Sequence, residues 1–331
     1  MNLAMNATKW KKQGVCIALL IAVLASAVAK AQDTAATALP DYSTVAGISG
    51  KLSIDSGNVP ENLAAMWLDR FSAYYPDVSV ELDNSGSSAA SNALIDTSQT
   101  LALMGRPMSD TELAAFEAKY GYRPMGIKVA HGAVVIYVSD TNPISQINLA
   151  QLDAVFSRNL SCGETQAISS WRQLGVKDKQ TQDQINLVGL ELGSSESEIL
   201  RQRALCDGDF RVDMQQLTSA AAVQAVVATD GAALGFADLG SGMTGVKGLS
   251  IGRTAKGPFI AASADNIRRG SYPLAHDFYI YVNRPPDGSM PPLEHEFIRM
   301  LLSDVGQRVV TEMGYLSLSP GEIQQQLALL K

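Results

Sequence analysis

The chain is poor in the residue types that carry most enzyme chemistry. It has three histidines, at positions 131, 276 and 295, and three cysteines among its 331 residues. It has no Gly-x-Ser-x-Gly nucleophile elbow, no Cys-x-x-Cys pair and no Gly-x-x-x-x-Gly-Lys-Ser/Thr phosphate loop. His295-Glu296 lacks the second histidine four residues on that a zinc site of this kind uses. We therefore predict no catalytic residues, no metal site and no cofactor, and we expect a protein that is not an enzyme.

Basic residues become scarce once the N-terminal segment is set aside. Residues 1–31 hold four lysines and no acid, so the rest of the chain has 22 basic and 33 acidic residues, a net charge near −11. Nucleic acids and anionic membranes are bound by clustered Lys and Arg, so we predict neither as a partner. A small anion remains compatible with this charge, because backbone N–H groups at helix N-termini can bind it.

The N-terminus has the pattern of a cleavable export signal. Lysines precede an apolar run of about fifteen residues (14–28), and Ala29-Lys30-Ala31 supplies a small-x-small cleavage site. The run is shorter than the roughly 20 residues that span a bilayer, which disfavours a membrane anchor. Cys16 lies within the run, away from the cleavage point, so a lipoprotein is not expected. We predict a signal peptide over 1–31, cleavage before Gln32 and a soluble periplasmic protein.

The remaining chain is longer than one hydrophobic core usually serves, so two lobes are expected. Strand and helix patterns alternate along it, which favours an α/β fold of parallel sheets covered by helices. A flexible leader is expected over 32–46. Predicted strands are 51–54, 78–82, 101–104, 185–190 and 233–237. Predicted helices are 63–74, 89–95, 110–119, 149–156, 196–205 and 219–228, with one long amphipathic helix over 293–313.

Two extended stretches suit chain crossings between the lobes, one over 127–138 and the other over 278–282. They predict a first lobe made of 47–134 with 275–331 and an inserted second lobe over 135–274. Ligand would then bind in the cleft between the lobes, at the carboxyl ends of the strands.

Two cysteines, Cys162 and Cys206, remain after the predicted cleavage. An even number of cysteines in an oxidising compartment favours a disulfide between them. Two unpaired thiols are the alternative, and the sequence leaves it open.

Small and hydroxyl residues gather where three predicted strands give way to helices. The junctions are Ser56-Gly57-Asn58, Ser85-Gly86-Ser87-Ser88 and Gly193-Ser194-Ser195. A helix N-terminus offers unpaired N–H donors and a partial positive charge, and glycine lets an oxyanion approach the backbone. Taken singly, such residues are more often helix caps: Asn58 with Glu61, and Ser195 with Glu198, have capping-box spacing. Their joint placement at strand ends favours a binding site.

Several motifs in this sequence resemble the phosphate-binding proteins of bacterial phosphate ABC importers, over nearly the whole chain after residue 31. The matching segments are Gly86-Ser87-Ser88, Ala93-Leu94-Ile95, residues 104–110, 120–124, 140–144, 272–274, 279–286, 306–307 and 314–315. The resemblance implies a type II periplasmic-binding-protein fold, two α/β lobes and closure about a hinge. It also implies phosphate or a similar oxyanion as ligand, an ABC permease of the inner membrane as partner and a monomeric receptor.

Carried over position by position, the resemblance keeps Ser87, Ser88, Arg106 and Ser194 as ligand-binding residues. The full predicted set of ligand-binding residues is Gly57, Asn58, Ser87, Ser88, Gly105, Arg106, Ser194 and Ser195. The sequence departs from the family pattern at Val59, Ala89, Gly105, Leu190 and Glu196. Leu190 replaces an arginine, and Glu196 would repel phosphate unless it points away from the pocket. A diverged paralogue with a different solute, or a ligandless exported protein, is the alternative function.

Overall fold

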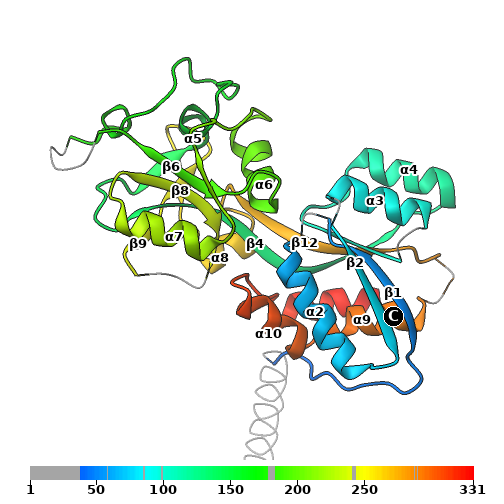
Figure 1. The fold of residues 1–331 in the computed structure, drawn as a ribbon. Helices are drawn as coiled ribbons and strands as arrows, with labels where there is room; N and C mark the ends of the chain where they lie inside the picture. The colour runs from blue at the N-terminus through cyan, green and yellow to red at the C-terminus, as the bar shows by residue number, and fades with distance from the viewer. Residues whose placement is uncertain are drawn as a thin grey trace, which may run out of the picture.

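The computed structural model describes residues 38–57, 59–84, 86–97, 100–177, 183–240, 244–286, 288 and 290–331. The predicted signal peptide and the first part of the predicted leader lie outside these residues. The described chain forms two α/β bodies joined by two long strands (Figure 1). Within these residues, no helix is both long and apolar enough to cross a membrane.

The first body has parallel strands with an amphipathic helix, α2, packed on them. Its strands are β1 (Gly50–Asp55), β2 (Val78–Asp83) and β3 (Leu101–Met104), and its helices are α2 (Glu61–Tyr74), α3 (Ser87–Asp96), α4 (Asp110–Tyr120), α9 (Pro292–Leu301), α10 (Asp304–Glu312) and α11 (Pro320–Leu329). Strand β1 pairs in parallel with both β2 and β3. Apolar residues of α2 recur every three or four positions, so Trp67 and Phe71 reach the core and are fully buried. Phe71 meets Phe297 of α9 edge to face at 5.2 Å between ring centroids.

The second body is built in the same way around a separate core. Its strands are β5 (Gln146–Asn148), β6 (Asn186–Leu190), β7 (Gln215–Leu217), β8 (Ala233–Asp238), β9 (Val246–Gly248), β10 (Ser250–Gly252) and β11 (Phe259–Ile260), and its helices are α5 (Leu149–Phe156), a 3-10 helix (Trp171–Leu174), α6 (Ser195–Ala204), α7 (Ala220–Thr229) and α8 (Ala264–Arg268). Strand β6 pairs in parallel with β7 and β8. A disulfide joins Cys162, after α5, to Cys206, at the end of α6.

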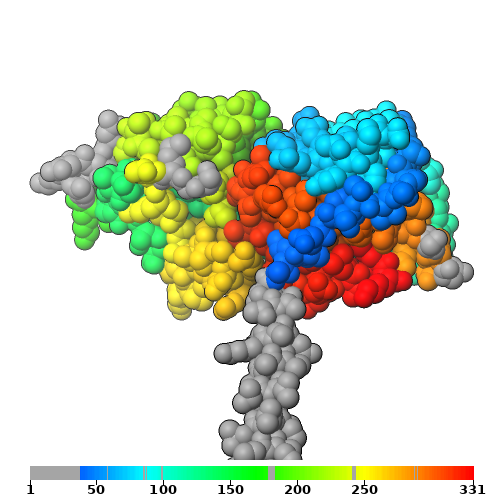
Figure 2. Space-filling view, turned by 90° about the horizontal axis from the view of Figure 1, so that it is seen from below, coloured from blue at the N-terminus to red at the C-terminus, as the bar shows by residue number. Residues whose placement is uncertain are grey.

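Two strands, β4 (Met125–Ser139) and β12 (Ala275–Val282), run through both bodies (Figure 1). The first part of β4 pairs with β12 and its last part pairs with β8. The residues of β4 up to Ala130 therefore pack in the core of the first body, and those from Ala133 onward pack in the core of the second body. Figure 2 shows the two bodies side by side, with the green and yellow middle of the chain on one side and the blue, cyan and red segments on the other. The lobe boundaries at 134 and 275 stay a prediction.

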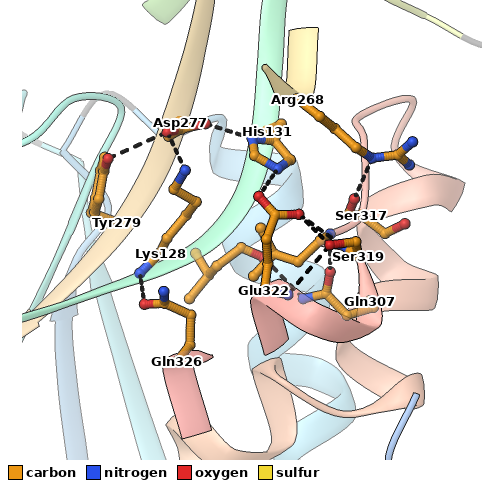
Figure 3. Close-up of polar contacts among 12 residues, drawn as sticks. Lys128, His131, Arg268, Asp277, Tyr279, Gln307, Ser317, Ser319, Glu322 and Gln326 are labelled. Carbon is orange, nitrogen blue, oxygen red and sulfur yellow. Dashed lines mark hydrogen bonds and ion pairs between the residues drawn. The ribbon is translucent and has the colours of Figure 1, made fainter. Parts of the chain in front are cut away.

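A charged network lies on these crossing strands (Figure 3). The two ring nitrogens of His131 lie 2.5 Å from an Asp277 oxygen and 3.0 Å from a Glu322 oxygen. Lys128 Nζ lies 2.7 Å from the other Asp277 oxygen. Burial alone would raise the pKa of Asp277, but hydrogen bonds from His131 and Lys128 lower it to about 2. Hydrogen bonds of His131 and the Lys128–Asp277 ion pair thus link β4, β12 and helix α11 where the bodies meet.

The prediction of one long C-terminal helix is wrong. The chain forms two helices there, α9 and α10, separated at Leu302 and Ser303, and a third, α11, follows them. A Cβ on Gly306 would collide with the backbone of Met300 and Leu301, so the glycine lets α10 fold back against the end of α9. The apolar repeat continues through the break, because both helices bury one face in the same core.

Candidate functional site

A cavity of about 1090 Å³ lies between the two bodies. Its wall includes the first residues of α2, α6 and α7 and Gly86, the N-cap of α3, and each of these helices follows a strand that ends at the cavity. The end of β8 and the residues after α10 complete the wall. The carboxyl edge of parallel strands is where open α/β sheets bind ligands, so this cavity is the candidate site.

The four helix N-termini give the cavity a set of backbone donors. The lining residues at these starts are Pro60 to Asn62, Gly86, Ser194 to Glu196 and Ser219 to Ala221. The first turn of a helix leaves N–H groups without an intrahelical acceptor and carries about half a positive charge. Two cap hydroxyls are already engaged: Ser194 accepts from the Ser197 amide and Ser219 accepts from the Ala222 amide.

Some of the predicted binding residues lie on this wall. Gly57, Ser194 and Ser195 line the cavity. Asn58 and the side chain of Ser87 lie outside what the structure describes. The predicted cap Ser195 is displaced by one residue, because Ser194 is the N-cap of α6 and Ser195 is its first helical residue. Helix α2 begins after Pro60 without a side-chain cap hydrogen bond.

Three other predicted binding residues lie in the first body but do not line the cavity. Ser88, Gly105 and Arg106 do not occur among the described residues that line the cavity. The Arg106 guanidinium donates to both Glu112 oxygens, at 2.7 and 2.8 Å, and to the Ser88 hydroxyl at 3.2 Å. Burial would raise the pKa of Glu112, but hydrogen bonds from Arg106, the Ser109 amide and Ser91 lower it to about 2. The guanidinium is thus engaged by a protein carboxylate, and its role in ligand binding stays a prediction.

The cavity wall is acidic. Its lining residues include five carboxylates and, among the described residues, no Lys, Arg or His; the acids are Glu61, Glu191, Glu196, Asp238 and Glu312. Glu196 does not turn outward, since it lines the cavity and is only 4% exposed. Leu190, where the family pattern has arginine, also lines the cavity. Of the two orientations open for Glu196 from sequence, the structure has the one that faces the pocket.

Glu196 and Asp238 contact the same hydroxyl. The Tyr315 hydroxyl lies 2.8 Å from an Asp238 oxygen and 3.5 Å from a Glu196 oxygen. Burial, and then the nearby charge of Asp238, raise the pKa of Glu196 to about 7. Burial also raises the pKa of Asp238, against the hydrogen bond from Tyr315. Glu196 is buried and Asp238 is partly buried, so both acids bind protons more strongly than exposed acids do.

Gln224 of α7 adds a polar group to the same wall. It lines the cavity, is only 3% exposed and places its amide nitrogen beside Gly240, where a Cβ would collide with it. Burial raises the pKa of the neighbouring Tyr137 hydroxyl, and the Gln224 side chain acts against this rise. The Tyr137 hydroxyl donates to the backbone carbonyls of Asp238, the last residue of β8, and of Leu239. Among the described residues, the Gln224 nitrogen makes no hydrogen bond of acceptable geometry. It is a buried donor at the edge of the cavity.

Sequence reasoning missed Asp238, Gln224, Tyr315 and the start of α7. The sequence predicts a helix over 219–228 but not the short strand β7 before it. It therefore does not predict the fourth strand-to-helix junction. Strand β7 is three residues long and reads Gln-Gln-Leu, which carries almost no apolar alternation. The Ser219 cap before an apolar helix was the one available signal. Among the described residues, no cluster of His, Cys, Asp or Glu is arranged to hold a metal ion.

Two α/β bodies joined by crossing strands, with a cavity between them, define a two-lobed solute-binding protein. The PBP superfamily domain matches residues 29–305. The chain is 34% identical over 281 residues to the phosphate-binding protein PstS of Pseudomonas aeruginosa, strains PAO1 and UCBPP-PA14, covering 85% of this chain and 87% of the relative. It therefore belongs to the PBP superfamily and, within it, to the PstS family of phosphate-binding proteins, which are solute-binding proteins and not enzymes.

Solved structures agree on the fold. A possible phosphate-binding protein from Planctomyces limnophilus superposes with a TM-score of 0.73 at 20% identity, covering 86% of this chain and 98% of that one. An ABC-type phosphate transport receptor from Vibrio cholerae superposes with a TM-score of 0.63 at 20% identity, covering 81% of this chain and all of that one. The predicted family resemblance and the predicted periplasmic-binding-protein fold are thus confirmed.

Proposed function

We propose that this protein is the solute-binding receptor of an ABC importer and that it captures phosphate or a similar oxyanion in the cavity between its bodies. The observation that carries the proposal is the meeting of four helix N-termini at one cavity. Membership of the PstS family supports the ligand class. The partner would be an ABC permease of the inner membrane, and the receptor would act in the periplasm after loss of residues 1–31.

Backbone donors suit this task because they need no countercharge from a side chain. A hydrogen bond to a charged group contributes roughly 1.5–3 kcal/mol, so several convergent N–H groups can hold an oxyanion without lysine or arginine. Gly57 and Gly86, which precede α2 and α3, take left-handed backbone conformations, with φ of 52° and 86°. The Gly57 N–H is already engaged, since it donates to Asp55 Oδ1 at 2.9 Å. Glycine adopts such conformations without strain and leaves the backbone open to a ligand oxygen.

The acidic wall supports a second candidate, a paralogue that binds a different solute. A carboxylate about 4 Å from a phosphate oxygen, in surroundings of intermediate dielectric, opposes binding by up to about 4 kcal/mol. That is nearly a thousandfold in affinity. Ionised Glu196 and Asp238 would both act in this direction, and Leu190 supplies no compensating charge.

Calorimetric titration of phosphate into the chain from Gln32 onward tests the proposal directly, with sulfate titrated in parallel. We expect saturable heat with a dissociation constant below about 1 mM. Absence of both heat and thermal stabilisation at millimolar phosphate would remove phosphate as the ligand and leave the second candidate.

A charge placed at the start of α7 gives a matched test of the helix N-termini. Ala221 is exposed and lines the cavity, whereas Ala225 is exposed on the same helix outside the lining residues. We expect A221D to weaken phosphate binding by about tenfold, because a carboxylate would occupy the anion's surroundings. A225D adds the same net charge and should change the dissociation constant less than about twofold. Equal affinities for the two variants, or tighter binding by A221D, would contradict an oxyanion at this helix start.

A further inference from the structure

The pair formed by Glu196, which is buried, and Asp238, which is partly buried, has fewer donors than its charges require. Tyr315 has one hydroxyl proton, and it lies 2.8 Å from Asp238 but 3.5 Å from Glu196. The backbone at Gly240 also donates to Asp238. The Glu196 carboxylate accepts from the Glu196 backbone N–H, so it has one donor of its own beside the more distant Tyr315 hydroxyl. A ligand that brings donors would complete the pair.

No protein cation compensates the pair within the described wall. The groups around it are the helix start of α6, the end of β8, Tyr315 after α10 and Gln224 of α7. Of these, only the helix start carries positive charge, about half a unit, and none is a Lys, Arg or His side chain. The other charged lining residues are also acids: Glu61, Glu191 and Glu312. Buried carboxylates in proteins are normally paired with a cation or fully hydrogen-bonded. The missing countercharge therefore points to a cation supplied by the ligand.

Gln224 is an independent sign that a ligand completes this wall. Gln224 is 3% exposed and lies on the same cavity, and its side chain interacts with the Tyr137 hydroxyl. Its amide nitrogen makes no hydrogen bond of acceptable geometry among the described residues. A buried amide donor without a partner destabilises the folded protein unless something else accepts its proton. The cavity thus presents carboxylates as acceptors and, beside them, an amide and helix N-termini as donors.

Resting on the proposed oxyanion site, we propose that the natural ligand also carries an ammonium group, which is held between Glu196 and Asp238. The ligand class is then an aminoalkyl phosphate or phosphonate, with its oxyanion at the helix N-termini. The cavity, at about 1090 Å³, has room for such a molecule in addition to the phosphate group itself. The acidic wall, which opposes free phosphate, becomes a selectivity element for a zwitterion.

Calorimetry with matched probes tests the proposal at about pH 8, where a primary ammonium is charged. The probes are phosphoethanolamine, ethyl phosphate, which has a similar size but no amine, inorganic phosphate and ethanolamine. We expect phosphoethanolamine to bind at least about tenfold more tightly than ethyl phosphate. In the E196Q/D238N variant this preference should fall below about twofold. E164Q, which changes an exposed carboxylate of the second body outside the cavity lining, should keep the preference.

Each outcome separates the two proposals. Ethyl phosphate or phosphate binding as tightly as phosphoethanolamine overturns the ammonium site and leaves the oxyanion site standing. Binding of ethanolamine without binding of ethyl phosphate or inorganic phosphate supports the ammonium site and overturns the oxyanion proposal. Absence of binding for every probe overturns both. If the double variant does not fold, E196Q alone carries the test, and an unchanged preference in that variant counts against the ammonium site.

Discussion

Replacing Glu196 with Gln should stabilise the ligand-free protein by about 3 kcal/mol at about pH 8 and leave its stability unchanged near pH 4. In the folded protein the pKa of Glu196 is raised to about 7, mainly by burial and then by Asp238. A carboxyl whose pKa is raised on folding contributes stability that is fully present below its ordinary value near 4.5. That contribution is lost as pH rises through about 7. Gln keeps the neutral form at every pH, so the variant escapes the loss.

Urea unfolding of the two proteins across this pH range measures the effect. The wild type should lose free energy of unfolding between about pH 4.5 and pH 7 relative to E196Q, and the difference should then level off. E191Q is the matched control, because Glu191 is an exposed carboxylate at the same strand-to-helix junction. A constant difference between wild type and E196Q across the range would show that Glu196 is not a buried titrating acid.

Removing the disulfide between Cys162 and Cys206 should destabilise the second body by about 4 kcal/mol. The bond closes a loop of 44 residues in sequence separation, and a loop of this length strongly restricts the unfolded chain. It also ties the end of α6 to the segment after α5, where the Cys162 amide donates to the buried Asp153 at 2.7 Å. The expected loss belongs to the second body, because both cysteines lie there.

Hydrogen exchange of a C162A/C206A variant localises this loss. Peptides from β6, β8 and α6 should exchange faster in the variant, whereas peptides from β1, β3 and α2 should keep their protection. Reducing agent added to the wild type should reproduce the variant's pattern and should leave the variant itself unchanged. Uniform loss of protection in both bodies, or no loss in either, would contradict a local effect on the second body.

Much of the fold could be predicted because local patterns and burial agree. The strand at Leu101–Met104 and the helix at Leu149–Phe156 have the predicted bounds, since a short apolar run or an amphipathic repeat specifies each of them. The break between α9 and α10 could not be predicted from the apolar repeat. The repeat continues across it, and only the close approach of Gly306 to the preceding helix end reveals the turn.

The site was harder to predict because small local differences decide its chemistry. Placing the cap of α6 at Ser195 in place of Ser194 shifts the helix by one residue, which rotates each side chain by about 100°. The direction of Glu196 therefore could not be fixed from the capping pattern. Tyr315 and Asp238 lie far apart in sequence, and only the folded chain brings their side chains together. The junctions at residues 57 and 194–195 were found because glycine and serine mark helix starts.

Strand β4 pairs with β12 in one half and with β8 in the other, so a single ladder connects both bodies. Successive side chains of a strand point to opposite faces, and one inserted residue would invert every position that follows. In β4 such an insertion would turn the second body about the first and direct its helix starts away from the cavity, although each core could still pack. The number of residues in β4 therefore fixes the orientation of one body relative to the other. Substitutions at the strand-to-helix junctions, as at Leu190 and Glu196, can change which ligand binds, while β4 keeps the two sides of the cavity facing each other.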